Sequence, residues 1–375
     1  MTDLPVSRKL PIEHLSASFG NVTNSYKFYW FLSILEHVKE NQTSFIPLNK
    51  LLANMVASVW YPVNYFRLSF GKQDRLSQIV LKIKSEDNLA NDAKKREVVN
   101  AILTHISTSS EIASEIMSLG RFVPYRFMRP FFKRELQGKP DWKIDSLVVD
   151  LAEKSFNHPE NLCLYRFVSH PENGIEIQKD WFEYLQKHLH ILIGFCLWHL
   201  LEYLQKNNPN VPNIPRKIFE PKQRELKQAR IFWDIALDEL GLVQCIYSNQ
   251  AIQKYQISLD HFLPWSFVAH DFLWNIIPTE KGVNSAKGDN LPDIKLYFDP
   301  FSKLQYNAFQ AVFNPKKVKN FEDYTLLFKK DEVTEIKSLS FAEFRETLYN
   351  TVIPQIQIAK NMGFTANWRY FKPLI

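Results

Sequence analysis

Apolar residues recur every three to four positions through most of the first 240 residues, a spacing that predicts amphipathic helices. The pattern is clearest over 23–38, 92–106, 180–208 and 221–240. In the third segment Asp180 is a candidate N-cap, and prolines after residue 208 end the helix because proline cannot donate a backbone hydrogen bond. Gly241 is placed to terminate the fourth segment.

The pattern changes between residues 242 and 262, where two runs rich in β-branched and aromatic residues flank the turn-like Ser248-Asn249-Gln250. This arrangement predicts a β-hairpin. Helices return after residue 291, and Ser340 with Glu343 predicts a capping box at the start of one of them. We therefore predict a mainly α protein with a small β-containing module in its C-terminal half. The expected domains are a helical domain for recognition, regulation or partner binding (1–240), the module (241–295), and C-terminal helices that pack on it (296–375).

Composition narrows the class of protein. The 375 residues suffice for two domains of about 100–200 residues each, and a hydrophobic content of 45% argues against disorder. Cys163, Cys196 and Cys245 form no CxxC pair, which excludes a disulfide framework. The most apolar stretch, 189–201, is too short to cross a bilayer, and the N-terminus has no apolar signal region. We expect a cytoplasmic protein without membrane contacts, and its net charge of +6 weakly favours a phosphate-rich partner.

Candidate chemistry lies between residues 258 and 292, in a segment that begins SLDHFLPWSF and ends KGDNLP. Asp260 and His261 are followed by Asn275, Asn284 and Lys287. An Asp-His pair alone would carry little information. These five residues in this order, with Pro-x-Ser-Phe and Lys-x-Asp-Asn-Leu-Pro, resemble the HNH or ββα-metal nuclease family. The segment is especially similar to the HNN-type HNH domain of RNA-guided CRISPR effectors, and the resemblance covers this module alone.

The resemblance implies roles that suit phosphodiester hydrolysis. His261 is implied as the general base, since a neutral imidazole can take a proton from the attacking water. Asp260 and Asn284 are implied as oxygen ligands of Mg²⁺ or Mn²⁺. Asn275 is expected to clamp the loop that holds His261, and Lys287 to contact a phosphate oxygen. Because neighbouring strand residues point to opposite faces, Asp260 and His261 can address one phosphate only if the strand ends and the backbone turns there.

The sequence departs from the family pattern in two respects. Many family members carry two CxxC pairs that bind a structural zinc, but here Cys245 is followed by Ser248 in the position of the second cysteine. We therefore expect no structural zinc, and packing against the helical flanks must support the module. His270 and Asp271 also lie in the loop after His261, where they could assist the assigned groups, although exposure at the surface is the ordinary role of such residues.

Two basic stretches outside the motif are candidate nucleic-acid contacts. Residues 121–139 interleave arginine and lysine with aromatic residues, a combination that can bind phosphates and stack on unpaired bases. Residues 214–230 are also rich in basic side chains. The candidates are Arg126, Arg129, Lys133, Arg216, Lys217 and Arg224. The alternative is that the first stretch fills the core with its aromatics and the second is an ordinary solvated helix face.

We therefore expect a metal-dependent endonuclease that cuts duplex DNA. Two alternatives stay open: the same chemistry on RNA or single-stranded DNA, and a nucleic-acid-binding scaffold with an idle HNH fold. One module cuts one strand, so double-strand cleavage would need a homodimer or sequential nicks. A nuclease without restraint would endanger its host, which suggests control by a protein partner or a ligand. The layout also resembles bacterial HNH proteins of antiviral defence and restriction.

Overall fold

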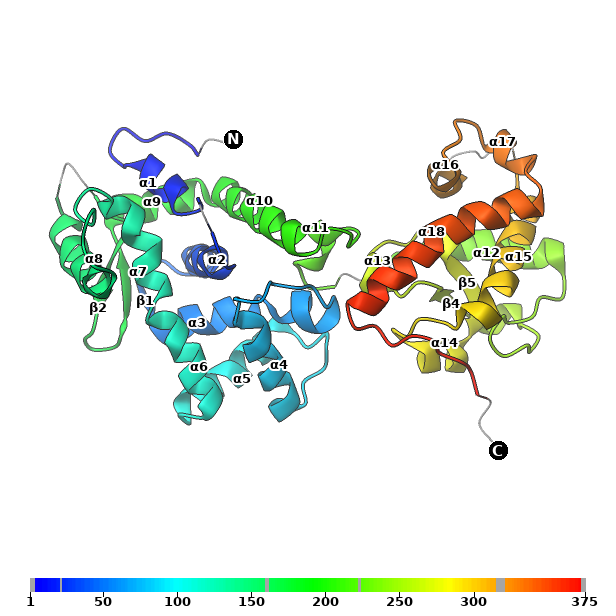
Figure 1. Cartoon of the computed structure of the whole chain (residues 1–375), viewed down its shortest axis with the longest axis horizontal. Helices are drawn as coiled ribbons and strands as arrows, with labels where there is room; N and C mark the ends of the chain where they lie inside the picture. The colour runs from blue at the N-terminus through cyan, green and yellow to red at the C-terminus, as the bar shows by residue number, and fades with distance from the viewer. Residues whose placement is uncertain (1–3, 21, 159–161, 222–223, 315–320, 372–375) are drawn as a thin grey trace. The chain divides into compact units, whose positions relative to one another are not determined.

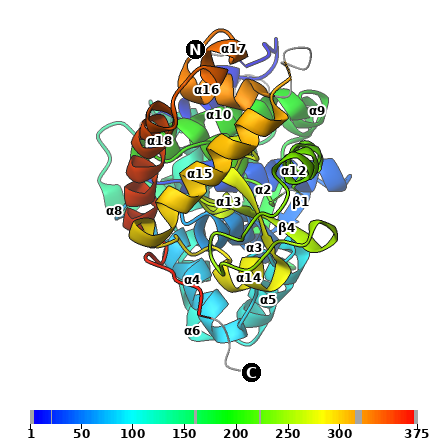
Figure 2. The same ribbon diagram turned by 90° about the vertical axis from the view of Figure 1, so that its right-hand side faces the viewer.

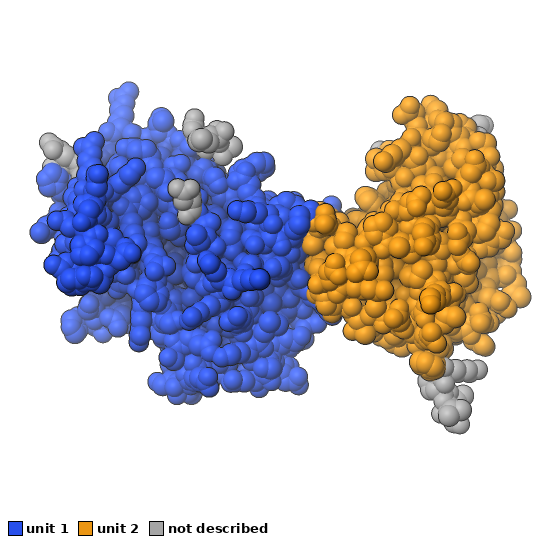
Figure 3. Space-filling view, in the orientation of Figure 1, with its two compact units in different colours: residues 1–209, 214–221 blue, residues 210–213, 222–375 orange. Residues whose placement is uncertain are grey.

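The computed structural model describes residues 4–20, 22–158, 162–221, 224–314 and 321–371. The chain forms two compact units, coloured separately in Figure 3. The first comprises residues 1–209 and 214–221, and the second comprises residues 210–213 and 222–375. Residues 222–240, which the sequence assigned to the N-terminal helical domain, thus lie in the second unit.

The first unit is built mainly from helices whose apolar faces form its core. Within it α2 packs against α3 and α10 (Figure 1). Its helices are α1 (Ile12–Ala17), α2 (Tyr26–Glu40), α3 (Leu48–Ala57), α4 (Leu76–Asp87), α5 (Lys95–Ser107), α6 (Glu111–Gly120), α7 (Val123–Met128), α8 (Asp141–Ser155), α9 (Lys179–Lys187), α10 (Leu189–Asn207) and α11 (Ile214–Lys217), with short π and 3₁₀ turns η1 (Tyr61–Tyr65) and η2 (Arg129–Phe132).

The helix predicted over 180–208 is divided into α9 and α10. The backbone leaves helical geometry at His188, where φ is −109° and ψ is 18°. The cap of α9 also differs from the prediction, because the side chain of Gln178 accepts the N–H of Trp181 at 3.1 Å while Asp180 lies in the first turn. None of the described helices, α10 included, is long and apolar enough to cross a membrane.

The first unit also contains a small antiparallel sheet in the order β1 (Phe45–Pro47), β3 (Gly174–Ile177), β2 (Tyr165–Val168). The sequence predicted only helices here. Strands of three and four residues are too short to show an alternating pattern, and β1 pairs with a strand far away along the chain. Gly174 permits this pairing, because a Cβ atom there would lie 2.4 Å from the carbonyl oxygen of Ile46.

The second unit surrounds a two-stranded sheet with helices. Gly241 terminates the helix before the sheet with a φ of 68°, and Ser340 and Glu343 form the predicted capping box. The elements are α12 (Lys227–Leu240), η3 (Lys254–Gln256), β4 (Ile257–His261), α13 (Trp265–Val268), η4 (Leu273–Asn275), β5 (Ile276–Glu280), α14 (Lys281–Lys287), α15 (Ile294–Val312), α16 (Glu322–Phe328), α17 (Val333–Lys337) and α18 (Phe341–Asn361). The fold class is therefore as predicted, mainly α with a small ββα unit in the C-terminal half.

The hairpin predicted over 242–262 is wrong in its pairing. Strand β4 pairs with β5, which follows it, in antiparallel register. The earlier run forms a turn held by an isolated bridge between Gln244 and Ala251. The strand β5 offers the buried Ile276 and Ile277 as cross-strand partners, and α14 packs on both strands.

One apolar core joins the ββα unit to α12 and the C-terminal helices. Helix α15 packs against both α12 and α18 (Figure 2). Polar contacts cross this core as well: Trp233 Nε1 donates to the Ile276 carbonyl at 3.0 Å, and Gln305 Nε2 donates to the carbonyls of Leu273 and Ile276 at 3.2 and 2.8 Å. Tyr324 donates in turn to Gln305 at 2.7 Å. The helices thus bind the backbone of η4 and β5 directly.

Replacement of Gln305 by leucine should destabilise the second unit by about 2–4 kcal/mol, because buried backbone carbonyls and the Tyr324 hydroxyl would lose a hydrogen-bond partner. Urea unfolding followed by circular dichroism measures the change. The control is Gln357→Leu on the exposed face of α18, which should leave stability within about 0.5 kcal/mol. An equal loss of unfolding free energy in the two variants would contradict the prediction.

Candidate active site

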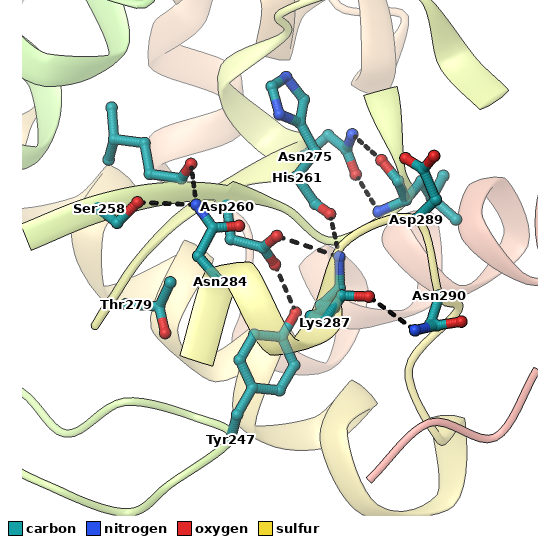
Figure 4. A network of polar contacts seen from close by, with 12 residues as sticks. Tyr247, Ser258, Asp260, His261, Asn275, Thr279, Asn284, Lys287, Asp289 and Asn290 are labelled. Atoms are coloured by element: carbon teal, nitrogen blue, oxygen red, sulfur yellow. Dashed lines mark hydrogen bonds and ion pairs between the residues drawn. The ribbon is translucent and has the colours of Figure 1, made fainter. Parts of the chain in front are cut away.

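The candidate site lies where β4, β5 and α14 meet (Figure 4). Asp260 pairs with Ile277 and His261 with Ile276, so both residues belong to the strand. Their side chains therefore point to opposite sides, as alternation along a strand requires, and Figure 4 shows the imidazole directed away from the carboxylate. The backbone turn that would direct both toward one phosphate does not occur before His261.

Asp260 is held by two buried donors. Its side chain is 3% exposed, and its oxygens accept the hydroxyl of Tyr247 at 2.8 Å and the ammonium group of Lys287 at 3.0 Å. Burial and the charge of Asp260 raise the pKa of Tyr247 well above its usual value, so the phenol remains a donor. Each carboxylate oxygen retains a further lone pair, since a carboxylate accepts about four hydrogen bonds in all.

Lys287 occupies a different place from the one the sequence suggested. Its side chain is fully buried, and its Nζ donates to Asp260 Oδ1 at 3.0 Å and to the carbonyl of His261 at 2.7 Å. A buried carboxylate requires such a partner, because an unpaired charge in the interior is strongly unfavourable. In this arrangement the ammonium group holds the end of β4 and is not presented to a phosphate.

Asn284 lies in the middle of α14 and binds the same strand. Its Nδ2 donates to Ser258 Oγ at 2.7 Å and to the carbonyl of Leu259 at 3.1 Å. These two bonds assign the amide nitrogen to the strand and leave the amide oxygen as the acceptor available to a ligand. The amide nitrogen of Asn284 is thereby bound to Ser258 and Leu259, the two residues that precede Asp260.

Asp260 and Asn284 offer one carboxylate and one amide as oxygen donors. No cluster of three or more His, Cys, Asp or Glu side chains able to hold a metal occurs among the described residues. Mg²⁺ and Mn²⁺ accept such a set, because they bind hard oxygen atoms and Mg²⁺ usually keeps several waters. The residues present therefore fit a magnesium-type ion better than zinc.

His261 is buried and paired with Asp271. Its side chain is 2% exposed, and its Nε2 lies 2.8 Å from Asp271 Oδ1. Burial alone would raise the pKa of Asp271, but the hydrogen bond and the charges of His261, Arg224 and His270 outweigh it and hold that pKa below its usual value. An ionised Asp271 places the proton on Nε2. The other nitrogen, Nδ1, is buried without a hydrogen-bond partner in the described part of the chain.

The sequence did not identify Asp271 as the partner of His261. It lies ten residues after the histidine in an irregular loop, and no periodicity links the two. The only signal was its presence in that loop, beside His270. The ring of His270 stacks on Phe272, with ring centroids 4.0 Å apart.

Asn275 clamps the loop that follows β4. Its Oδ1 accepts the N–H of Leu263 at 2.8 Å, and its Nδ2 donates to the carbonyl of the same residue at 3.0 Å. Its own carbonyl accepts the N–H of Phe262. These three bonds fix the backbone directly after His261, and the side chain is fully buried. Any catalytic contribution of Asn275 is therefore through the loop.

Residues 245–293 match the family model of the HNH endonucleases. This segment is an HNH module. The match supports nuclease activity and leaves the helical first unit and the C-terminal helices outside it. No curated protein and no solved structure matches the chain significantly. The comparison with CRISPR effectors rests on the motif residues and stays a prediction.

A hydrogen bond connects the two short motifs of the HNH module, Pro-x-Ser-Phe and Lys-x-Asp-Asn. Ser266, from Pro-x-Ser-Phe, donates to Asp289 at 2.7 Å, and Asn290 Nδ2 donates to the carbonyl of Lys287 at 2.9 Å. Gly288, which lies between Lys287 and Asp289, has a φ of 48°, a backbone conformation that favours glycine. The motif Lys-x-Asp-Asn thus ends α14 and ties its end to the loop after His261.

Many HNH proteins carry zinc-binding cysteines in the segment that here contains Cys245 and Ser248, and in this protein hydrogen bonds connect that segment to β5. Cys245 Sγ lies 3.0 Å from Thr279 Oγ1, and the hydroxyl of Ser248 donates to Glu280 at 2.6 Å. Both partners lie at the end of β5. Side-chain hydrogen bonds therefore anchor the turn of residues 245–248 to the sheet.

The six basic candidates are divided between the two units. Arg126, Arg129, Lys133, Arg216 and Lys217 belong to the first unit, and Arg224 belongs to the second, with its guanidinium 5.7 Å from the Trp265 ring. Lys217 is fully buried, and burial lowers its pKa to about 7. A phosphate contact by Lys217 is therefore not supported.

Replacement of Lys287 by methionine should destabilise the second unit by about 3–5 kcal/mol, because Asp260 would be left as a buried charge with no cation. Adding Asp260→Asn to this variant should recover part of the loss, since the two residues interact directly. Thermal and urea unfolding measure both. The control, Lys254→Met, breaks the exposed pair with Asp238 and should cost less than about 1 kcal/mol; a similar cost for both lysines would refute the assignment.

Proposed function

We propose that the HNH module hydrolyses phosphodiester bonds of duplex DNA with His261 as the general base. The observation that carries this proposal is the pairing of His261 with Asp271, which leaves Nδ1 without a partner in the described part of the chain. A neutral imidazole with one nitrogen bound to a carboxylate can accept a proton from water at the other nitrogen. No further group is needed for this step.

In this proposal Asp260 and Asn284 would hold Mg²⁺ or Mn²⁺. The bound ion would offset negative charge on the scissile phosphate and its leaving oxygen. Lys287 and Tyr247 keep the Asp260 carboxylate in one orientation. We therefore assign Lys287 to positioning Asp260 and not to a direct phosphate contact.

Asp271 would act through His261. Its carboxylate keeps the ring proton on Nε2 and stabilises the positive charge that the ring acquires when Nδ1 takes a proton. Asn275 fixes the adjoining backbone, and the bond to Asp271 orients the ring. In the conformation observed, these contacts hold the proton acceptor at one position.

The proposal includes control of the activity by a protein partner or a ligand. Two observations support it: the His261 ring is 2% exposed, and its side chain points away from Asp260. Water and phosphate can meet both groups only after the loop between His261 and Asn275 changes conformation. Cytoplasmic location, homodimer formation for double-strand cleavage, and a role in antiviral defence or restriction are further parts of the proposal that rest on the sequence alone.

The substrate is tested by cleavage of labelled duplex DNA, single-stranded DNA and RNA by the full chain, with Mg²⁺, with Mn²⁺ and with a chelator. We expect metal-dependent cutting of the duplex. Preferential cutting of RNA or single-stranded DNA would support the alternative substrates. Binding without cleavage under every condition would support an idle scaffold.

Replacement of His261 by alanine should lower the cleavage rate by about 10²–10⁴-fold, because the reaction loses its general base. Binding of duplex DNA should change little. The matched control is His270→Ala in the same loop: its ring stacks on Phe272 and it acts on Asp271 only through its charge, so this variant should lower the rate by less than about tenfold. Cleavage at the wild-type rate by the His261 variant would disprove the proposed mechanism.

Replacement of Asp271 by asparagine should lower the cleavage rate by about 10–100-fold, since an amide cannot stabilise the charged ring in the same way. The same substitution in the His261→Ala background should have no further effect, because Asp271 acts only through that histidine. Single-turnover cleavage measures both. An equal loss in the two backgrounds would assign Asp271 a separate role.

A further inference from the structure

A cavity of about 500 Å³ lies in the first unit, and none of the described residues that line it belongs to the HNH module. It is bordered by the end of α1, the start of α2, α6 and α7. Its volume falls within the range of about 300–1,000 Å³ that is typical of small-molecule sites. The cavity includes part of the aromatic and basic stretch 121–139 singled out in the sequence.

Four cationic side chains line this cavity: Lys27 from α2, Arg75 at the start of α4, Arg126 from α7 and Arg129 from η2. No Asp or Glu is among the described residues that line it. Four positive groups from separate segments of the chain therefore surround a space with no lining carboxylate.

The positive charge is only partly neutralised within the protein. Arg129 Nη2 donates to Asp145 at 2.9 Å, but its Nε is buried without a hydrogen-bond partner in the part of the chain that the structure describes. Lys27, Arg75 and Arg126 take part in none of the ion pairs found among the described residues. Burial, and then the charges of Arg129 and Arg126, lower the pKa of Lys27. An anion in the cavity would relieve this repulsion.

The rest of the lining combines the polar Thr23, Asn24 and Ser118 with apolar and aromatic residues. Leu119, Val123 and Pro130 contribute to it, and the ring of Phe122 is 47% exposed. The guanidinium of Arg126 lies 5.1 Å from the centre of that ring. An aromatic ring with a neighbouring arginine offers a planar group both a stacking surface and a cation.

We propose that this cavity binds a nucleotide, with its phosphate groups on Lys27, Arg75, Arg126 and Arg129 and its base against Phe122. The number of cations favours more than one phosphate, and the exposed ring favours a flat base over an inorganic polyphosphate. The same chemistry is offered by a free nucleotide and by the end of a DNA strand. The proposal concerns the first unit alone and does not depend on the nuclease activity of the second.

The test is equilibrium binding to the full chain, measured by calorimetry with ATP, adenosine and inorganic triphosphate, and by fluorescence anisotropy with a labelled 5′-phosphorylated single-stranded oligonucleotide. We expect ATP to bind more tightly than adenosine and inorganic triphosphate. Replacement of Arg126 by methionine should weaken ATP binding at least about tenfold, the usual effect of losing a hydrogen bond to a charged group. Phe122→Ser should weaken binding of ATP but not of triphosphate.

Arg121→Met is the matched control, because Arg121 is exposed, adjoins Phe122 and does not line the cavity. It should bind ATP as the wild type does, and thermal unfolding should show that all variants remain folded. Tighter binding of the oligonucleotide than of ATP, with the same loss in Arg126→Met, would identify the strand end as the source of the nucleotide. Equal binding by the Arg121 and Arg126 variants, or no binding of either nucleotide probe, would overturn the proposal.

Discussion

The buried ion pair between Lys287 and Asp260 joins the last turn of α14 to the end of β4, and the rest of the HNH module depends on it. Through its second bond, to the carbonyl of His261, the same ammonium group fixes the backbone that carries the proposed base. A pair with both charges buried is favourable only when each remaining polar atom is satisfied. Tyr247 meets this requirement at the second carboxylate oxygen.

Much of the site could be predicted from the sequence because its residues lie close together along the chain. The family resemblance rests on the order and spacing of four residues, Asp260, His261, Asn275 and Asn284. Contacts within the irregular loop could not be read in this way. The bond from His261 to Asp271 depends on how the loop folds back, and no spacing rule specifies that path.

The fold was predictable to a similar degree and for similar reasons. Long helices with a continuous apolar face, such as α12 and α18, leave a periodic signal that ends at recognisable caps. The sheet of the first unit leaves none, since its strands are short and β1 pairs with β3 across a long stretch of chain. The pairing of β5 with β4 likewise depends on tertiary contacts, since Trp233 and Gln305 donate hydrogen bonds to the carbonyl of Ile276 in β5.

The bonds from Gln305 and Trp233 to the backbone of β5 also bear on how such a protein can change during evolution. Because the apolar core of the HNH module continues into α12, α15, α16 and α18, the segment that matches the family is smaller than the segment that folds around one core. Recombination that moved residues 245–293 alone into another protein would expose that core. The unit that could be transferred intact is therefore the module together with its helices, and a substitution on one side of this core must still fit the other.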